Sequence, residues 1–191
     1  ENHNYYPSTP YAASKLAGDL HLITLFKKYN FPVIFSRSAN IYGPCQQLYR
    51  IIPRTIIFLK MRKEIELHAK GKTKRSFIHI KDVVNAICNL IDSGNIGQVY
   101  HIAPQNNEIS IYNLVKLICN MMGCDFMSSV KLITENYGQD SLYSLNSDKI
   151  RNETSWSEKI SFEEGINDTI KWISDNWEII SNMPHEYIHS I

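Results

Sequence analysis

The sequence predicts an α/β fold, because short apolar strands alternate with helical patterns along the chain. The first pair shows this most clearly. Apolar residues of segment 11–29 recur at three- and four-residue spacing, which predicts a helix, and residues 31–36 then form the apolar run of a short buried strand. With 191 residues and a hydrophobic share of 43%, the chain can bury a sizeable core.

The same alternation continues toward the C-terminus. We expect helices at residues 51–61, 82–92, 111–122, from 147 and at 162–179, and strands at residues 65–68, 76–80, 99–103 and 130–133. Pro53 fits the first turn of its helix, and Asp82 and Ser110 are the expected N-caps of the next two. Residues 37–47 and 69–74 are expected as loops, with turn residues at Gly43 and Gly71.

Charge and cysteine usage narrow the class of protein. A formal net charge of +1 gives no reason to expect nucleic acid or an anionic membrane as the main partner. No apolar run approaches the roughly 20 residues that span a bilayer, and no signal peptide is recognisable. The four cysteines form no CxxC pair and no metal-ligand cluster, so we expect no metal and reduced thiols in a cytoplasmic protein, with Cys88 and Cys119 buried in helices.

The start of the chain suggests a piece of a longer polypeptide, because it opens at Glu1 in a polar loop rather than at Met. No glycine-rich GxGxxG turn follows a strand, so nothing in the sequence can seat a dinucleotide pyrophosphate in the usual manner. If a dinucleotide is used, we expect its main site upstream or on another chain.

Tyr11 and Lys15 form the sharpest candidate for chemistry. At positions i and i+4 of a helix they share one face. An ammonium group close to a phenol favours the phenolate, and a phenol tuned in this way can move a proton to or from a carbinol oxygen. The alternative is an aromatic and a charged residue that merely share a helical surface, and spacing alone does not exclude it.

Five segments in order resemble the extended short-chain dehydrogenase/reductase family, the NAD-dependent epimerases and dehydratases. They are TPYAASKLAGD around Tyr11 and Lys15, RSANIYGP at 37–44, RIIP at 50–53, KGKTKRSFIHIKDVVNAI at 70–87 and NYGQDSLYSLNSDKI at 136–150. Within the family the chain is most similar to the nucleotide-sugar 4,6-dehydratases, those of dTDP-glucose in particular. The resemblance covers nearly the whole chain.

The resemblance implies NAD as cofactor and a nucleoside-diphosphate sugar as substrate. Tyr11 would be the catalytic base at the sugar C4 hydroxyl, with Lys15 beside it at the nicotinamide ribose and Ile41 next to the cofactor. Arg75 would hold the diphosphate, which suits the forked geometry of a guanidinium. The other substrate contacts would be Asn40, Arg50, Ile51, Glu66, Leu67, His68, Asn106, Glu135, Asn136, Tyr137, Gly138 and Gln139.

Several of these positions have a simpler interpretation. Arg75 follows three lysines and could belong to a solvated charged turn, and Asn40 could brace the turn before Gly43. His68 could be an ordinary half-buried strand residue, and Asn106 lies in a natural loop composition. The family's usual R-P-G is Asn136-Tyr137-Gly138 here, which removes one positive charge from the implied pocket.

The resemblance also implies the organisation of the chain. Residues 1–44 would be the tail of a Rossmann NAD-binding domain, and residues 45–191 the smaller mixed α/β substrate domain. A homodimer would form through the Tyr11–Lys15 helix, with Leu16, Leu20 and Ile23 at the contact. The dehydratase's Asp-Glu pair would precede residue 1, so an epimerase or decarboxylase of the same family stays open, as does a non-catalytic nucleotide-sugar-binding module.

Overall fold

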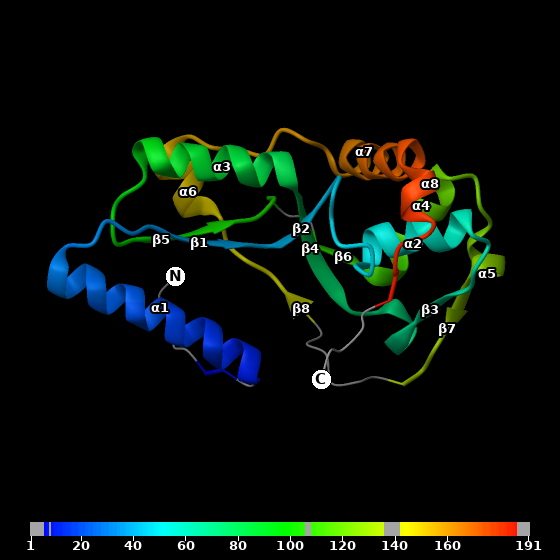
Figure 1. Cartoon of the computed structure of the whole chain (residues 1–191), viewed down its shortest axis with the longest axis horizontal. Coiled ribbons are helices and arrows are strands. Elements are labelled where there is room, and N and C mark those ends of the chain that lie inside the picture. Colours follow the sequence, from blue (N-terminus) through cyan, green and yellow to red (C-terminus); the bar gives the residue numbers. More distant parts are fainter. Residues whose placement is uncertain (1–5, 8, 106–107, 136–141, 187–191) are drawn as a thin grey trace.

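The computed structural model describes residues 6–7, 9–105, 108–135 and 142–186, and these form a mixed α/β structure, as expected (Figure 1). The helices are α1 (Pro10–Tyr29), α2 (Ile51–Lys60), the 3₁₀ helix η1 (His68–Gly71), α3 (Ile80–Ser93), α4 (Ile111–Met121), α5 (Phe126–Ser129), α6 (Asp148–Thr154), α7 (Phe162–Asp175) and α8 (Trp177–Ile180). The strands are β1 (Phe35–Ser38), β2 (Asn40–Tyr42), β3 (Ile65–Leu67), β4 (Lys74–His79), β5 (Val99–Ile102), β6 (Glu108–Ser110), β7 (Val130–Leu132) and β8 (Leu142–Tyr143).

One end of the molecule is built on the parallel pair β1–β5, in which Phe35 lies opposite Val99 and Ser38 opposite Ile102. Helix α3 lies along one side of this pair and α1 along the other (Figure 1). The core on the α3 side includes buried side chains of α3, β5 and α6, with Tyr100, Ile102 and Ile150 fully enclosed. Parallel strands need such covering helices because both of their faces must be buried.

The other end packs α2, α4 and α7 together in a second core (Figure 1). Seven of the ten residues of α2 are buried, and Pro53 occupies its first turn as expected. Ser110 caps α4 by accepting a hydrogen bond from the Asn113 amide, which confirms the expected N-cap. Helix α7 begins with a capping box between Ser161 and Glu164.

Strand β4 connects the two cores. It pairs with β2 in parallel and with β6 in antiparallel register, and β8 also lies parallel to it. Because successive strand residues point to opposite faces, Phe77 enters the α2 core while Ile78 enters the α3 core. Residues from both sides of position 44 contribute to each core, and the expected domain boundary there stays a prediction.

Five details of the expected elements are wrong. The first strand, expected at residues 31–36, is β1 and begins only at Phe35. Residues 37–47 are not all loop, because β1 extends to Ser38 and β2 follows at once. The last helix is interrupted at Asn176. Asp82 does not cap α3, whose N-cap is His79. Cys88 is exposed, whereas Cys119 is fully buried as expected.

Helix α1 differs from the others because none of its residues is buried. Thr9 caps it, Asn30 ends it in the left-handed conformation, and Leu20 is 50% exposed. It is nevertheless anchored from its middle onward, since Asp19 forms an ion pair with Arg37 at 2.5 Å and Phe26 lies against Gly97. The described part of the chain contains no helix with both the length and the apolar character needed to cross a bilayer.

Candidate active site

A pocket of about 990 Å³ opens where β1 ends and β2 begins, the usual place for a ligand in a parallel sheet. Its walls come from the start of α1, from β2 and the turn after it, from the start of α2 and from β4. Six residues that the sequence motifs select line it: Tyr11, Asn40, Ile41, Arg50, Ile51 and Arg75. The fold therefore brings together residues from four separate motifs.

Tyr11 reaches this pocket from the first turn of α1, which starts at Pro10 behind the Thr9 cap. The phenol is 74% exposed, so a ligand can reach it. Lys15 follows one turn later on the same helical face, as its spacing predicts, and its side chain is also exposed. Lys15 is not among the residues that line the pocket.

Asn40 and Ile41 stand side by side on β2. The Asn40 amide nitrogen donates a hydrogen bond to the Ser76 carbonyl at 3.0 Å, so this side chain braces β2 against β4 as well as lining the pocket. The turn that follows needs a glycine at position 43. Its φ is +140°, and a Cβ there would lie 2.7 Å from Ile80 Cγ2.

Two guanidinium groups give the pocket its charge. Arg75 lies on β4, not in the charged turn before it, and donates a hydrogen bond to the Lys74 carbonyl at 2.8 Å. Arg50 immediately precedes α2, with its guanidinium 5.4 Å from the Tyr49 ring. No Asp or Glu belongs to the described lining, and a cationic pocket of this kind favours an anionic ligand group such as a phosphate.

A second group of motif residues gathers at the end of β3, separate from the lining of this pocket. The Ala69 amide donates to the Glu135 carbonyl at 2.9 Å and the Lys70 amide to the Ile133 carbonyl at 2.8 Å, so the turn that starts at His68 is joined to the segment of Glu135. The side chain of Leu67 is buried in the α2 core, so only its backbone could contact a ligand.

Glu66 faces outward from the same strand. Its carboxylate is exposed and pairs with Lys131 at 3.0 Å, and this hydrogen bond and charge lower the pKa of Glu66. The predicted contacts Asn106, Asn136, Tyr137, Gly138 and Gln139 lie outside the described residues.

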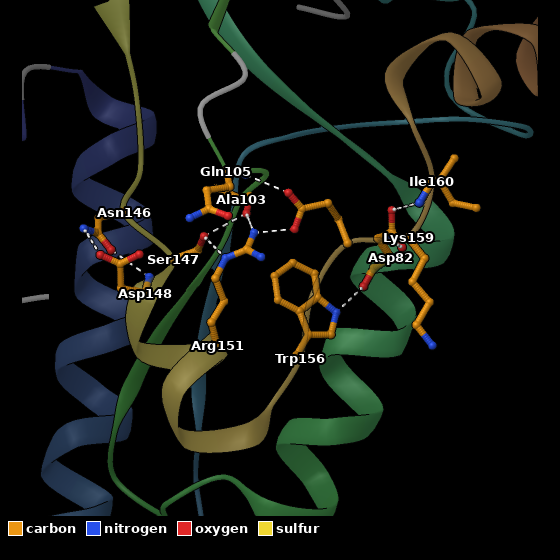
Figure 2. Close-up of polar contacts among 11 residues, drawn as sticks. Asp82, Ala103, Gln105, Asn146, Ser147, Asp148, Arg151, Trp156, Lys159 and Ile160 are labelled. Atoms are coloured by element: carbon orange, nitrogen blue, oxygen red, sulfur yellow. Dashed lines mark hydrogen bonds and ion pairs between the residues drawn. The ribbon is translucent and has the colours of Figure 1, made fainter.

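The segment that leaves β5 toward Asn106 is fixed by a polar network (Figure 2). The Ala103 carbonyl accepts hydrogen bonds from Ser147 at 2.8 Å and Arg151 at 3.0 Å. Arg151 pairs in turn with Glu158. The other carboxylate oxygen of Glu158 accepts a hydrogen bond from the backbone amide of Gln105 at 2.8 Å. The loop at this end of the sheet therefore has a defined course up to Gln105.

Asp82 supports the same region from α3 (Figure 2). Its buried carboxylate accepts hydrogen bonds from the backbone amides of Lys159 at 2.9 Å and Ile160 at 3.2 Å, and Trp156 donates to its carbonyl. The interaction ties the segment before α7 to the start of α3, which explains why an acidic residue follows β4 without capping the helix.

Sequence reasoning missed the rim between Gly43 and Arg50. Cys45, Gln46, Gln47 and Tyr49 also line the pocket, and their position between two recognised motifs was the one available signal. Tyr42, another lining residue, has a pKa raised by burial and by the nearby charges of Asp82 and Glu163, so its phenol stays protonated.

The fold is that of the extended dehydratases and epimerases, and the chain belongs to the NAD dependent epimerase/dehydratase family, whose model matches residues 1–103. It is 31% identical over 176 residues to a mouse dTDP-D-glucose 4,6-dehydratase and 29% identical over 186 residues to an Escherichia coli dTDP-glucose 4,6-dehydratase. These matches cover 90% and 94% of this chain but 49% and 51% of the relatives.

Solved structures share the fold of this chain. A dTDP-glucose 4,6-dehydratase from Bacillus anthracis in complex with NAD has a TM-score of 0.87 at 31% identity, over 94% of this chain and 56% of that one. A UDP-glucose 4-epimerase from Thermotoga maritima, with UDP-glucose, has a TM-score of 0.82 at 22% identity, over 90% of this chain and 55% of that one. The chain thus spans about half the length of the curated relatives it matches.

Proposed function

We propose that this chain is the C-terminal part of an NAD-dependent nucleotide-sugar 4,6-dehydratase, which converts a nucleoside-diphosphate hexose to its 4-keto-6-deoxy form. The observation that carries the proposal is the convergence of Tyr11, Asn40 and Arg75 on one pocket at the end of β1. The dehydratase relatives at about 30% identity support the reaction class.

In this proposal Tyr11 acts as its phenolate and accepts the proton of the sugar C4 hydroxyl, which makes it a neutral phenol, and Lys15, one turn later, stabilises the phenolate before the transfer. Arg75 and Arg50 bind the diphosphate and so fix the sugar relative to Tyr11. The family's Asp-Glu pair would act in the loss of water across C5 and C6, and we assign that step to none of the described residues.

The residues present fit only one end of NAD. Tyr11 and Ile41 line the pocket where a nicotinamide would lie, but no glycine-rich turn in this sequence could hold the pyrophosphate. When bound, NAD supplies acceptance of a hydride from C4 and its return to C6. The chain's own contribution is orientation and proton transfer.

The organisation of the whole protein is part of the proposal. Residues 1–44 would complete a dinucleotide-binding domain, and residues 45–191 would form the substrate domain. A homodimer would use the side of α1 that carries Leu16, Leu20 and Ile23. Half of the surface of Leu20 is exposed, so this contact would bury an apolar side chain that is open to solvent.

Calorimetric titration with dTDP-glucose, UDP-glucose and CDP-glucose tests the proposal. We expect one of them to bind and Arg75→Ala to weaken it by at least tenfold, since a charge-assisted hydrogen bond contributes about 1.5–3 kcal/mol. Lys74→Ala is the matched control, because it removes the same charge from the neighbouring residue of β4, which does not line this pocket.

Equal weakening by Arg75→Ala and Lys74→Ala would contradict the role of Arg75 and indicate a general charge effect. Absence of binding by a folded wild-type chain would contradict the proposed function for this part of the protein. In the complete enzyme, formation of a 4-keto-6-deoxy sugar distinguishes a dehydratase from the epimerase alternative, which would return a C4 epimer with C6 still hydroxylated.

A further inference from the structure

Gln46 stands out among the residues of the pocket rim. Its amide nitrogen donates a hydrogen bond to the Ile41 carbonyl at 2.7 Å, and its backbone amide donates to the Gly43 carbonyl at 3.3 Å. These two bonds fix the side chain across the turn that follows β2. The carboxamide oxygen, Oε1, is inaccessible to solvent and has no hydrogen-bond partner among the described residues.

An acceptor left in this state is costly. A buried polar atom without a partner costs about 1–3 kcal/mol, and most such atoms in folded proteins are satisfied. Turning the amide over would not relieve the cost, because Oε1 would then face the Ile41 carbonyl. Among the described residues that line the pocket, Gln46 is the one with a side-chain atom in this condition.

The chemistry of the pocket indicates what the missing donor is. A hexose presents several hydroxyl groups that donate hydrogen bonds, yet the described lining contains no carboxylate to accept them. Gln47, the neighbouring amide, already accepts a hydrogen bond from Tyr49. The cationic groups Arg50 and Arg75 suit the diphosphate, and the vacant carboxamide oxygen of Gln46 suits a hydroxyl.

We propose that Gln46 is a substrate-recognition residue, whose Oε1 accepts a hydrogen bond from a hydroxyl group of the sugar. The inference rests on the proposed function and adds to it a residue that reads the neutral sugar rather than the diphosphate. Because Oε1 is enclosed in this structure, the proposal requires the rim residues to shift when the sugar enters.

The test compares two affinities for each variant, that of the nucleotide sugar and that of the nucleoside diphosphate without the sugar. Their ratio measures the contribution of the sugar alone, so a general loss of folding or of charge cancels. Calorimetry with dTDP-glucose and dTDP, or with the base that the wild-type chain prefers, supplies both values. Gln46→Met keeps the length of the side chain and removes the acceptor, together with the donor to the Ile41 carbonyl.

We expect Gln46→Met to reduce this ratio roughly tenfold, the effect of one hydrogen bond at the upper end of its usual range, and to leave dTDP binding unchanged. Gln46→Glu keeps an acceptor oxygen. It should weaken both ligands through repulsion of the diphosphate and preserve most of the ratio. Gln98→Met, at an exposed glutamine before β5, is the control for the same chemical change outside the pocket.

Three results would overturn the inference. An unchanged ratio in a folded Gln46→Met variant, beside wild-type binding of the nucleotide sugar, would refute the role of Gln46 while the proposed function stands. A loss seen only when NAD is present would assign the donor to the nicotinamide amide instead. If the wild-type chain binds neither ligand, the proposed function fails and this inference fails with it.

Discussion

The two helices that flank the pocket are held in opposite ways. Helix α2 buries seven of its ten residues in the core, whereas α1, which carries Tyr11 and Lys15, buries none. Both sequences are helical by the spacing of their apolar residues. This spacing therefore predicts the helix but not what it packs against, because no described element covers α1 as the core covers α2.

Under the proposed function, this difference also separates the residues proposed for substrate binding from the residue proposed for proton transfer. Arg50 and Ile51 begin a helix that the core fixes in place, and Arg75 lies on the strand that connects the two cores. Tyr11 depends on a helix anchored by Asp19 at its middle and by Phe26 near its C-terminal end. Removal of those anchors would therefore affect catalysis more than nucleotide binding.

The largest expected effect comes from the core of α2. Ile56 is fully buried, and Ile56→Ala should lower the free energy of unfolding by about 2–5 kcal/mol through lost burial and a residual cavity. Leu20→Ala on α1 is the matched change and should stay within about 0.5 kcal/mol. Urea unfolding followed by circular dichroism measures both.

Similar losses for Ile56→Ala and Leu20→Ala would contradict the difference in burial between α2 and α1. They would mean that α1 is covered in solution, for example by a second copy of the chain. Sedimentation of wild type and Leu20→Ala at several concentrations would then decide whether the covering partner is that copy.

A smaller effect is expected where α1 is anchored. Gly97 has φ +81°, and a Cβ there would lie 2.4 Å from the Phe26 ring, so Gly97→Ala should cost about 1–3 kcal/mol from backbone strain and displacement of the helix. Gly123 has φ +65° with nothing within 4 Å of such a Cβ. Gly123→Ala therefore measures the backbone strain alone, about 1 kcal/mol.

The difference between the two glycine variants isolates the contact with Phe26, and thermal unfolding monitored by circular dichroism provides it. Phe26→Ala combined with Gly97→Ala should recover part of the loss, because the clash disappears with the ring. Strictly additive losses would show that Phe26 does not hold α1.

Local patterns predicted much of this fold. The spacing of apolar residues located α1 and α2, Pro53 and Ser110 marked helix starts, and the motifs selected six residues of the pocket. The missed features depend on contacts between distant segments. Strand β2 forms by pairing with β4, in which Asn40 lies opposite Phe77. Asp82 binds backbone amides 77 and 78 residues away. The environment of the Gln46 oxygen depends in the same way on the turn that brings Gln46 back against Ile41 and Gly43.

The smallest effect is a dependence of stability on pH, and it comes from His79, which lies behind the pocket residues Tyr42 and Gly43. His79, at the end of β4, is buried beside Tyr42 and Gly43, and its Nδ1 accepts a hydrogen bond from the Lys81 amide. Burial lowers the pKa of His79, and Lys81 acts in the same direction, while Asp168 and Asp82 oppose it. The folded protein therefore resists protonation of this imidazole more than the unfolded chain does.

Stability should accordingly fall on acidification. Above about pH 6.5, the ordinary value for histidine, His79 is neutral in both states and adds no pH dependence. Below it, the unfolded chain takes up a proton that the folded protein disfavours. His79→Asn retains a capping side chain and cannot titrate, so its deficit relative to wild type in urea unfolding should shrink between pH 7.5 and pH 5.5. If the stability difference between the two proteins stayed constant over this pH range, protonation of His79 would not affect stability. Lys81 and Asp168 keep their ion pair across this range because that pair lowers the pKa of Asp168 further below its usual acidic value.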